Sequence, residues 1–154
     1  MNTNPNRLRS TFVTGATGLL GNNLVRELVA RGYAVKALVR SAAKGAQQFG
    51  DVPGVELVVG DMADVDAFAA ALQGCDTVFH CAAFFRDNYK GGSHWEALEK
   101  INVVGTRALL QQSYDAGVRR FVHTSSIAVL DGAPGTPIDE TCLRAETDAD
   151  DYYR

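Results

Sequence analysis

A glycine-rich turn near the N-terminus constrains the fold of this chain more than any other feature. Residues 14–21 hold three glycines spaced three apart, after the apolar pair Phe12 and Val13 and before leucines at helical spacing. Glycine adopts positive φ without strain, and the free N–H groups of a helix N-terminus attract anions. The pattern predicts a strand, a phosphate-binding turn and a helix, with an ordinary tight turn as the alternative. Thr17 stands where the commoner dinucleotide fingerprint has its second glycine.

The remainder of the chain alternates short apolar runs with helical patterns. Strands are expected at residues 11–14, 34–39, 55–59, 77–81 and 121–124. Helices are expected at 19–31 and 95–116, and residues 40–54 are expected to be helix or loop. A further helix is expected from an N-cap at Asp64 to a stop at Gly74, with Val65, Phe68 and Leu72 on one face. Continuous apolar strands alternating with helices are typical of a parallel sheet covered on both faces. The expected fold class is therefore α/β, a Rossmann-type doubly wound parallel sheet in three layers.

Size and charge limit the possible classes of protein. The 154 residues, of which 46% are hydrophobic, suffice for one core, so residues 1–154 are expected to form a single domain. A net charge of -3 argues against a nucleic-acid partner. No apolar run approaches the roughly 20 residues that span a bilayer, and the polar start is unlike a signal peptide. We therefore expect no membrane partner and a cytoplasmic location. Cys75, Cys81 and Cys142 lack the spacing of metal ligands, which favours reduced thiols and no metal.

Small or polar residues follow each expected strand. In doubly wound sheets a ligand binds outside the carboxyl ends of the strands, so these residues are the candidates for binding a dinucleotide. The expected cofactor-binding residues are Gly15, Thr17, Gly18, Leu19, Leu20, Gly21, Arg40, Asp61, Met62, Ala82, Ala83 and Thr124.

The end of the second strand bears on which nicotinamide dinucleotide is bound. A carboxylate there would accept hydrogen bonds from the ribose hydroxyls of NAD, but no Asp or Glu occurs between residues 34 and 44. Arg40, Ser41 and Lys44 instead offer a guanidinium, a hydroxyl and an ammonium group for a 2'-phosphate. NADP is the preferred cofactor and NAD the alternative. The other interpretation is that Arg40 and Lys44 are solvated surface cations.

Four further residues have two interpretations each. The carboxylate of Asp61 could accept from the adenine amine while Met62 packs on the ring, or Asp61 could be a turn residue. Ala82 and Ala83 are small enough for the cofactor to lie against backbone, or they fill the core. Asn102 is unfavourable in mid-helix, so it either faces solvent or ties strand ends together, which we favour.

Five segments of the chain together resemble the extended short-chain dehydrogenase/reductases, the NAD-dependent epimerase/dehydratase family. They are residues 14–21, 60–62, 80–83, 102–106 and 121–126, within a resemblance that runs from about residue 12 to 154. The chain looks most like the dihydroflavonol-reductase and 3β-hydroxysteroid-dehydrogenase branch. The resemblance implies hydride transfer between nicotinamide and a carbonyl or hydroxyl carbon of a small, sugar-, steroid- or flavonoid-like substrate. Phe84, Phe85, Arg86 and Tyr89 agree with a ring-bearing substrate, or they contact a further lobe.

The same resemblance implies two catalytic residues. Ser126 takes the place of the catalytic hydroxyl, with a strand-end hydroxyl as the alternative. The tyrosine of the family falls on Tyr152, which we prefer, or on Tyr153. A tyrosine with an ordinary pKa near 10 needs adjacent positive charge to act at neutral pH.

The sequence departs from the family pattern after this tyrosine. The family's lysine, four residues beyond the tyrosine, is missing because the sequence ends at Arg154. The chain therefore resembles the N-terminal, cofactor-binding half of a longer enzyme, and we expect little or no turnover from these 154 residues. Two alternatives remain: a non-catalytic dinucleotide-binding redox regulator, or an inactive fragment. Such a fragment would expose apolar surface and self-associate, for example as a homodimer.

Overall fold

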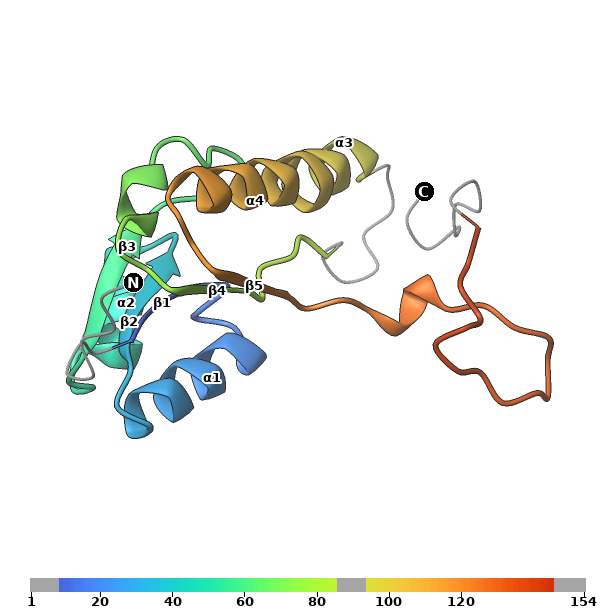
Figure 1. The fold of residues 1–154 in the computed structure, drawn as a ribbon, viewed down its shortest axis with the longest axis horizontal. Helices are drawn as coiled ribbons and strands as arrows, with labels where there is room; N and C mark the ends of the chain where they lie inside the picture. The colour runs from blue at the N-terminus through green and yellow to red at the C-terminus, as the bar shows by residue number, and fades with distance from the viewer. Residues whose placement is uncertain (1–8, 86–93, 146–154) are drawn as a thin grey trace.

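The computed structural model describes residues 9–85 and 94–145, which contain one five-stranded parallel sheet. The strands lie in the order β3-β2-β1-β4-β5 (Figure 1). Their bounds are β1 Ser10–Thr14, β2 Ala34–Val39, β3 Val55–Val59, β4 Thr77–His80 and β5 Arg120–His123. The five predicted strands are confirmed: β2 and β3 agree at both ends, and the other three lie within one residue of the prediction.

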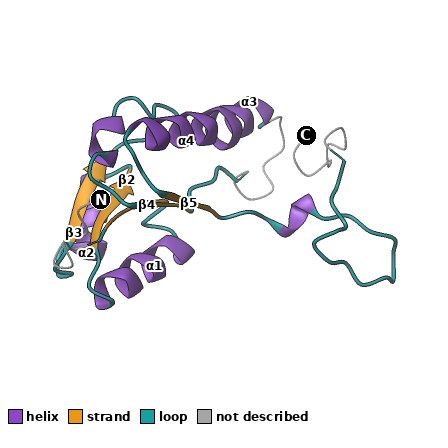
Figure 2. Cartoon of the chain, in the orientation of Figure 1, coloured by secondary structure: helices purple, strands orange, loops and turns teal. Residues whose placement is uncertain are grey.

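Helices cover both faces of the sheet, as the three-layer prediction requires. Figure 2 shows α1 on one side of the strands and α3 and α4 on the other. The helical elements are α1 Leu19–Ala30, α2 Ala42–Phe49, the 3-10 helix η1 Ala69–Leu72, α3 Trp95–Leu98, the π-helix η2 Glu99–Gly105, α4 Thr106–Asp115 and the 3-10 helix η3 Ile127–Val129. Within the described ranges, no helix is both long and apolar enough to cross a membrane.

The order of the strands reverses beside β1. The chain passes from β1 to β2 and β3 on one side, then returns to place β4 and β5 on the other side. In doubly wound sheets, the crevice at the carboxyl ends of the strands flanking this reversal is where ligands bind. The fold therefore directs attention to the residues that follow β1 and β4.

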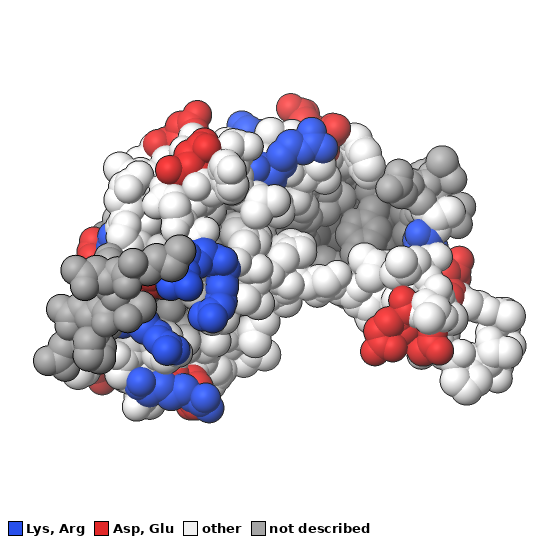
Figure 3. Space-filling model, viewed as in Figure 1, with Lys and Arg blue, Asp and Glu red and all other residues white. Residues whose placement is uncertain are grey.

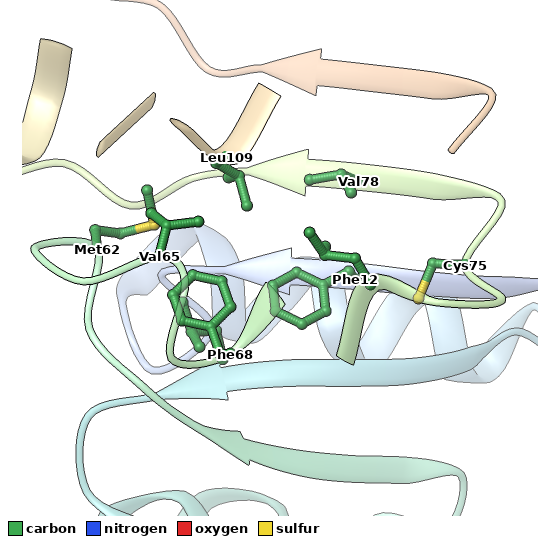
Figure 4. Close-up of a cluster of buried hydrophobic side chains, with 9 residues drawn as sticks. Phe12, Met62, Val65, Phe68, Cys75, Val78 and Leu109 are labelled. Carbon is green, nitrogen blue, oxygen red and sulfur yellow. The ribbon is translucent and has the colours of Figure 1, made fainter. Parts of the chain in front are cut away.

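Successive residues of β1 supply the two halves of the core. Phe12 and Val13 are both fully buried, and because side chains alternate along a strand they face opposite sides of the sheet. Val13 packs in a cluster with Val25 and Leu28 of α1. Phe12 packs in the other cluster, where its ring stacks on that of Phe68 with 5.8 Å between centroids (Figure 4). The sheet is therefore covered by apolar side chains on both faces.

The predicted helix from Asp64 to Gly74 is wrong. Turns and the short helix η1 occupy this segment, and backbone bonds such as Phe68 N to Val65 O and Ala71 N to Phe68 O span three residues. The apolar residues predicted to share one helical face, Val65, Phe68 and Leu72, are nevertheless all buried in the Phe12 cluster. A three-residue spacing suits 3-10 geometry, and the sequence pattern does not separate it from an α-helix.

The predicted helix at 95–116 is continuous but not uniform. A π-helical segment, η2, separates α3 from α4. A Cβ added to Gly105, at the end of this segment, would lie 2.4 Å from the carbonyl oxygen of Met62, so the helix contacts the loop after β3 at a point where no side chain fits. Hydrophobic periodicity carries no information about this local widening of the helix.

The chain beyond β5 extends away from the sheet (Figure 1). An antiparallel bridge between Leu130 and Leu143 closes the extended segment on itself. Most of its side chains are exposed, including the large apolar residues Ile127 and Leu143. The core described above therefore ends with β5.

Candidate nucleotide-binding site

A cavity of about 600 Å³ lies at the carboxyl ends of the strands. Its described lining includes residues that directly follow β1, β2, β3 and β4. The lining residues are Gly15, Thr17, Gly18, Leu38, Arg40, Lys44, Gly60, Asp61, Met62, Cys81, Ala82, Ala83, Phe84, Phe85 and Ile101. Eight of the twelve residues predicted to bind the cofactor are among them.

The glycine turn is built as the sequence predicts. Gly15 adopts a φ of 65°, which favours glycine, and a Cβ there would lie 2.7 Å from the amide nitrogen of Ala82. The N–H of Gly18 donates to the carbonyl of Gly15 at 2.9 Å and closes the turn. No side chain caps the N-terminus of α1, where Gly18 is the N-cap, so the first-turn N–H groups remain available to a ligand.

The remaining residues of the turn lie outside the cavity lining. Gly21 is buried, and a Cβ there would lie 2.2 Å from the carbonyl oxygen of Gly15. The structure thus explains the third glycine by the close packing of α1 against the turn. Leu19 and Leu20 begin α1 with exposed side chains. That Gly21, Leu19 and Leu20 contact a cofactor stays a prediction, in which their backbone groups in the first turn of α1 make the contact.

The end of β2 places two cations beside the cavity. Arg40 directly follows the strand, and Lys44 lies in the first turn of α2. The hydroxyl of Ser41 caps this helix by accepting from the N–H of Lys44 at 3.3 Å. Both cations are exposed, and Asp61 is the one carboxylate among the lining residues of the described chain.

Asp61 and Met62 differ in their exposure. One carboxylate oxygen of Asp61 accepts from the N–H of Ala63 at 2.9 Å, as in a turn, and the exposed side chain also lines the cavity. The two predicted roles of Asp61 are therefore compatible. Met62 is 4% exposed and packs in the cluster that contains Phe12 and Phe68 (Figure 4). It belongs mainly to the core, with the small exposed remainder at the cavity wall.

Asn102 holds the loop after β4, whose residues line the cavity. The N–H of Phe84 donates to Oδ1 of Asn102 at 2.7 Å, and Nδ2 donates to the carbonyl of Phe84 at 2.8 Å. The amide is therefore engaged rather than facing solvent, but it joins the loop after β4 to the helical segment and does not tie two strand ends together as predicted. Ala82 and Ala83 directly precede Phe84, the residue bonded to Asn102, and they line the cavity. Arg86 and Tyr89 lie outside the described residues.

The predicted catalytic residues are not brought into the cavity lining. Ser126 is exposed after β5, and its hydroxyl accepts from the N–H of Ala128 at 3.2 Å as the cap of η3. Thr124 donates to the sulfur of Cys81 at 3.5 Å, so it adjoins the lining without being part of it. Tyr152 and Tyr153 lie outside the described residues. The catalytic roles stay predictions.

No role is predicted for His80, the last residue of β4, which directly precedes the lining residue Cys81. Its ring is 1% exposed, with Nδ1 2.7 Å from the hydroxyl of Thr14 and Nε2 2.8 Å from that of Thr106. Burial, and secondarily the neighbouring His123, lower the pKa of His80 to about 4. The ring is therefore neutral at neutral pH. The sequence places this histidine at the end of an apolar strand and within the resembling segment 80–83, but neither signal names its partners.

Charge and metal-ligand chemistry elsewhere are unremarkable in the described ranges. Figure 3 shows both acidic and basic side chains on the viewed face rather than a continuous basic stripe. Residues 9–85 and 94–145 contain no group of three His, Cys, Asp or Glu side chains that could hold a metal ion. The three cysteines are free thiols.

The cavity residues fit a dinucleotide. Backbone after β1 and β4 meets at Gly15 and Ala82 without an intervening side chain, an arrangement that allows a pyrophosphate to approach main-chain N–H groups. Arg40 and Lys44 provide positive charge at one side, while Leu38 and Ile101 provide apolar wall. This combination of a few polar groups with apolar lining is typical of cofactor sites.

Sequence comparisons identify relatives of the chain. Residues 15–154 match the model of a family described as NAD(P)H-binding. The sterol demethylase protein B of Methylococcus capsulatus is 45% identical over 79% of this chain and 35% of its own length. A putative dihydroflavonol 4-reductase of Synechocystis is 42% identical over 77% of this chain and 33% of its own. A 3 beta-hydroxysteroid dehydrogenase/Delta 5→4-isomerase of Mycobacterium tuberculosis is 38% identical over 81% of this chain and 34% of its own.

Solved structures agree with these relatives. A short-chain dehydrogenase/reductase superfamily protein of Agrobacterium tumefaciens with bound NAD has a TM-score of 0.64 and 33% identity, over 79% of this chain and 34% of that one. The yeast methylglyoxal/isovaleraldehyde reductase complexed with NADPH has a TM-score of 0.70 and 28% identity, over 79% and 38%. The chain spans about a third of the length of the curated relatives it matches. The chain belongs to the extended short-chain dehydrogenase/reductase and epimerase family, of which it forms the NAD(P)-binding domain.

Proposed function

We propose that this domain binds NADP(H) in preference to NAD(H), and that it serves an oxidoreductase acting on an apolar, ring-bearing alcohol or ketone. The observation that carries the cofactor preference is the pair Arg40 and Lys44 at the cavity beside the end of β2. A guanidinium and an ammonium group bind a 2'-phosphate, and no carboxylate between residues 34 and 44 would repel it.

The chain's own residues divide the work of holding the cofactor. The uncapped N-terminus of α1 and the turn at Gly15 and Gly18 bind the pyrophosphate. Leu38 and Ile101 contact the adenine ring, and the free oxygen of Asp61 accepts from its amine. Ala82 and Ala83 let the cofactor lie against backbone. When bound, the nicotinamide ring supplies the hydride chemistry.

Two further residues handle the substrate in this proposal. The hydroxyl of Ser126 donates a hydrogen bond to the reacting oxygen and stabilises the charge that develops there. Tyr152 exchanges a proton with the same oxygen, which requires positive charge nearby because an ordinary tyrosine pKa lies near 10. The sterol and dihydroflavonol names of the relatives, and the aromatic rings of Phe84 and Phe85 at the cavity, support a ring-bearing substrate.

Titration of the chain with NADPH and NADH, followed by nucleotide fluorescence, tests the preference. We expect tighter binding of NADPH. The variant Arg40→Ala should lose about ten- to a hundredfold in NADPH affinity, because a hydrogen bond to a charged group contributes about 1.5–3 kcal/mol, while NADH affinity changes little.

Arg107→Ala is the matched control. Arg107 is an exposed arginine of α4 outside the cavity lining, so its removal changes the net charge equally without touching the site. Equal loss of NADPH affinity in both variants, or tighter binding of NADH by the unaltered chain, would contradict the proposal.

A further inference from the structure

The buried ring of His80 joins three elements at one point. His80 is the last residue of β4, Thr14 the last residue of β1 and Thr106 the first residue of α4. The ring lies 2.7 Å from the Thr14 hydroxyl through Nδ1 and 2.8 Å from the Thr106 hydroxyl through Nε2. The Thr14 hydroxyl also accepts from the N–H of Ala82 at 3.1 Å. A continuous chain of hydrogen bonds therefore runs from Ala82 to α4.

The hydrogens of this chain favour one tautomer of the histidine. Thr14 is fully buried, so the hydrogen of its hydroxyl needs an acceptor close by. An unprotonated Nδ1 of His80 provides that acceptor, and Nε2–H then donates to Thr106. In the other tautomer, Thr14 Oγ1 would accept from both Ala82 and His80, and its own hydrogen would need a further acceptor. The Nε2–H tautomer lets every bond run in one direction, from Ala82 through Thr14 and His80 to Thr106.

The surroundings of the ring keep it in the neutral state that this arrangement needs. A protonated imidazole has two donors and no acceptor, so it could not accept from Thr14. The ring of His80 stacks on that of His123 at 5.2 Å and tilts against Phe121 at 6.0 Å. Burial, and secondarily the neighbouring His123, lower the pKa of His80 and so disfavour its charged form.

The bonded groups adjoin the cavity lining. Ala82 lines the cavity, and Gly15, which also lines it, directly follows Thr14. The position of a Cβ on Gly15 lies 2.7 Å from the amide nitrogen of Ala82, so these two backbone segments have no room to shift towards each other. A displacement at Thr14 would therefore move both lining segments.

We propose that His80 is a positioning residue of the nucleotide site, which in its Nε2–H tautomer holds the backbone at Gly15 and Ala82 in register with α4. The effect on cofactor affinity rests on the proposed function, whereas the restraint on the backbone exists in the free protein. The residue touches neither cofactor nor substrate in this role and acts through Thr14 and Ala82.

Removing the far end of the chain of bonds tests this role without altering the cavity lining. Thr106→Val replaces the hydroxyl by a methyl group of similar size, and Thr106→Ser retains the hydroxyl. Ser113→Ala is the matched control, since Ser113 is a 2% exposed hydroxyl of the same helix that donates to the carbonyl of Leu109 at 2.6 Å. NADPH affinity, thermal unfolding and exchange of the Ala82 amide hydrogen are measured for each.

We expect Thr106→Val to weaken NADPH binding about fivefold and to speed exchange of the Ala82 amide by a similar factor, the change that corresponds to one typical net hydrogen bond. Thr106→Ser should bind as the unaltered chain does. Ser113→Ala should lower the midpoint of thermal unfolding yet leave both readouts within about twofold. Nitrogen NMR of the unaltered chain should show His80 protonated at Nε2.

Other outcomes overturn the proposal. One is that Thr106→Val loses stability as Ser113→Ala does, while its NADPH affinity and the exchange of its Ala82 amide stay unchanged. The other is a His80 ring protonated at Nδ1. If the unaltered chain binds no nicotinamide dinucleotide, the proposed function fails. The exchange of the Ala82 amide and the tautomer still decide whether His80 restrains the backbone. The tautomer measurement also decides the matter should Thr106→Val not fold.

Discussion

The side chain of Asn102 and the backbone of Phe84 make two reciprocal hydrogen bonds, of 2.7 Å to Oδ1 and 2.8 Å from Nδ2. Asn102 lies within the π-helical segment η2, and Phe84 lies in the loop that follows β4. The amide thus satisfies both polar groups of one residue at the cavity wall, as a neighbouring strand would.

Asn102→Ala should therefore destabilise the chain. It leaves the N–H and carbonyl of a partly buried residue without these partners, and each such group costs about 1–3 kcal/mol if it stays unpaired. We expect a loss of about 2 kcal/mol in the free energy of unfolding, measured in urea, together with weaker NADPH binding. Asn23→Ala is the control, because the exposed Asn23 of α1 bonds only the carbonyl of Leu19 in the described contacts. Similar losses in the two variants would show that the pairing with Phe84 contributes little.

Gly15→Ala should be more damaging than Gly32→Ala. Both glycines have a positive φ, 65° and 79°, so both substitutions incur the cost of a left-handed backbone, about 1 kcal/mol. A Cβ on Gly15 also meets the backbone of Cys81 and Ala82, whereas a Cβ on Gly32 meets nothing within 4 Å. The difference in unfolding free energy between the variants measures this close approach. Equal losses would mean that the loop after β4 moves away at little cost.

The stability of the chain should fall with acid in a way that depends on His80. The pKa is lowered from 6.5 to about 4, so between these values the unfolded state binds a proton that the folded state does not. Stability from this residue is present above pH 6.5 and is lost as the pH falls towards 4, with no further change below. The shift corresponds to about 3 kcal/mol at most, because one pKa unit is about 1.4 kcal/mol.

His80→Gln provides the comparison, since an amide keeps a donor and an acceptor but does not titrate in this range. The difference in unfolding free energy between the unaltered chain and this variant should change with pH between 4 and 6.5 and be constant outside that window. A difference that does not vary with pH would mean that His80 titrates normally in the folded protein.

The sequence predicts the strands and the glycine turn well because their signals are local. An apolar run such as Val55–Val59 and the spacing of Gly15, Gly18 and Gly21 depend on nearby residues alone. The failed helix at 64–74 shows the limit of this approach, since apolar residues spaced by three and four suit both α and 3-10 turns. Burial of these residues could be predicted, whereas the backbone geometry depended on the path from β3 to β4.

The site residues that the sequence does not predict depend on register between distant strands. The partnership of Thr14 with His80 follows from the pairing of β1 with β4, across 66 positions of sequence. Arg40 was predicted from chemistry at a strand end, but the lining role of Ile101 depends on the π-helical segment that contains it. Such contacts follow from packing between elements, which a local pattern does not specify.

An exposed apolar face of α4 leads to a last prediction, that the chain self-associates. Leu110 and Tyr114 are four residues apart on this helix and are 50% and 78% exposed. Apolar side chains grouped on one face favour association. Sedimentation velocity over a concentration series should show a dimer forming as concentration rises, and Leu110→Glu should weaken it, because a buried carboxylate would have to lose its water.

Gln111→Glu is the control for the added charge. Gln111 is the next residue along α4, so its side chain leaves the helix about 100° away from that of Leu110. We expect this variant to associate as the unaltered chain does, with both variants folded by circular dichroism. A monomer at every concentration, or equal weakening by the two substitutions, would exclude this face of α4 as the surface through which copies of the chain associate.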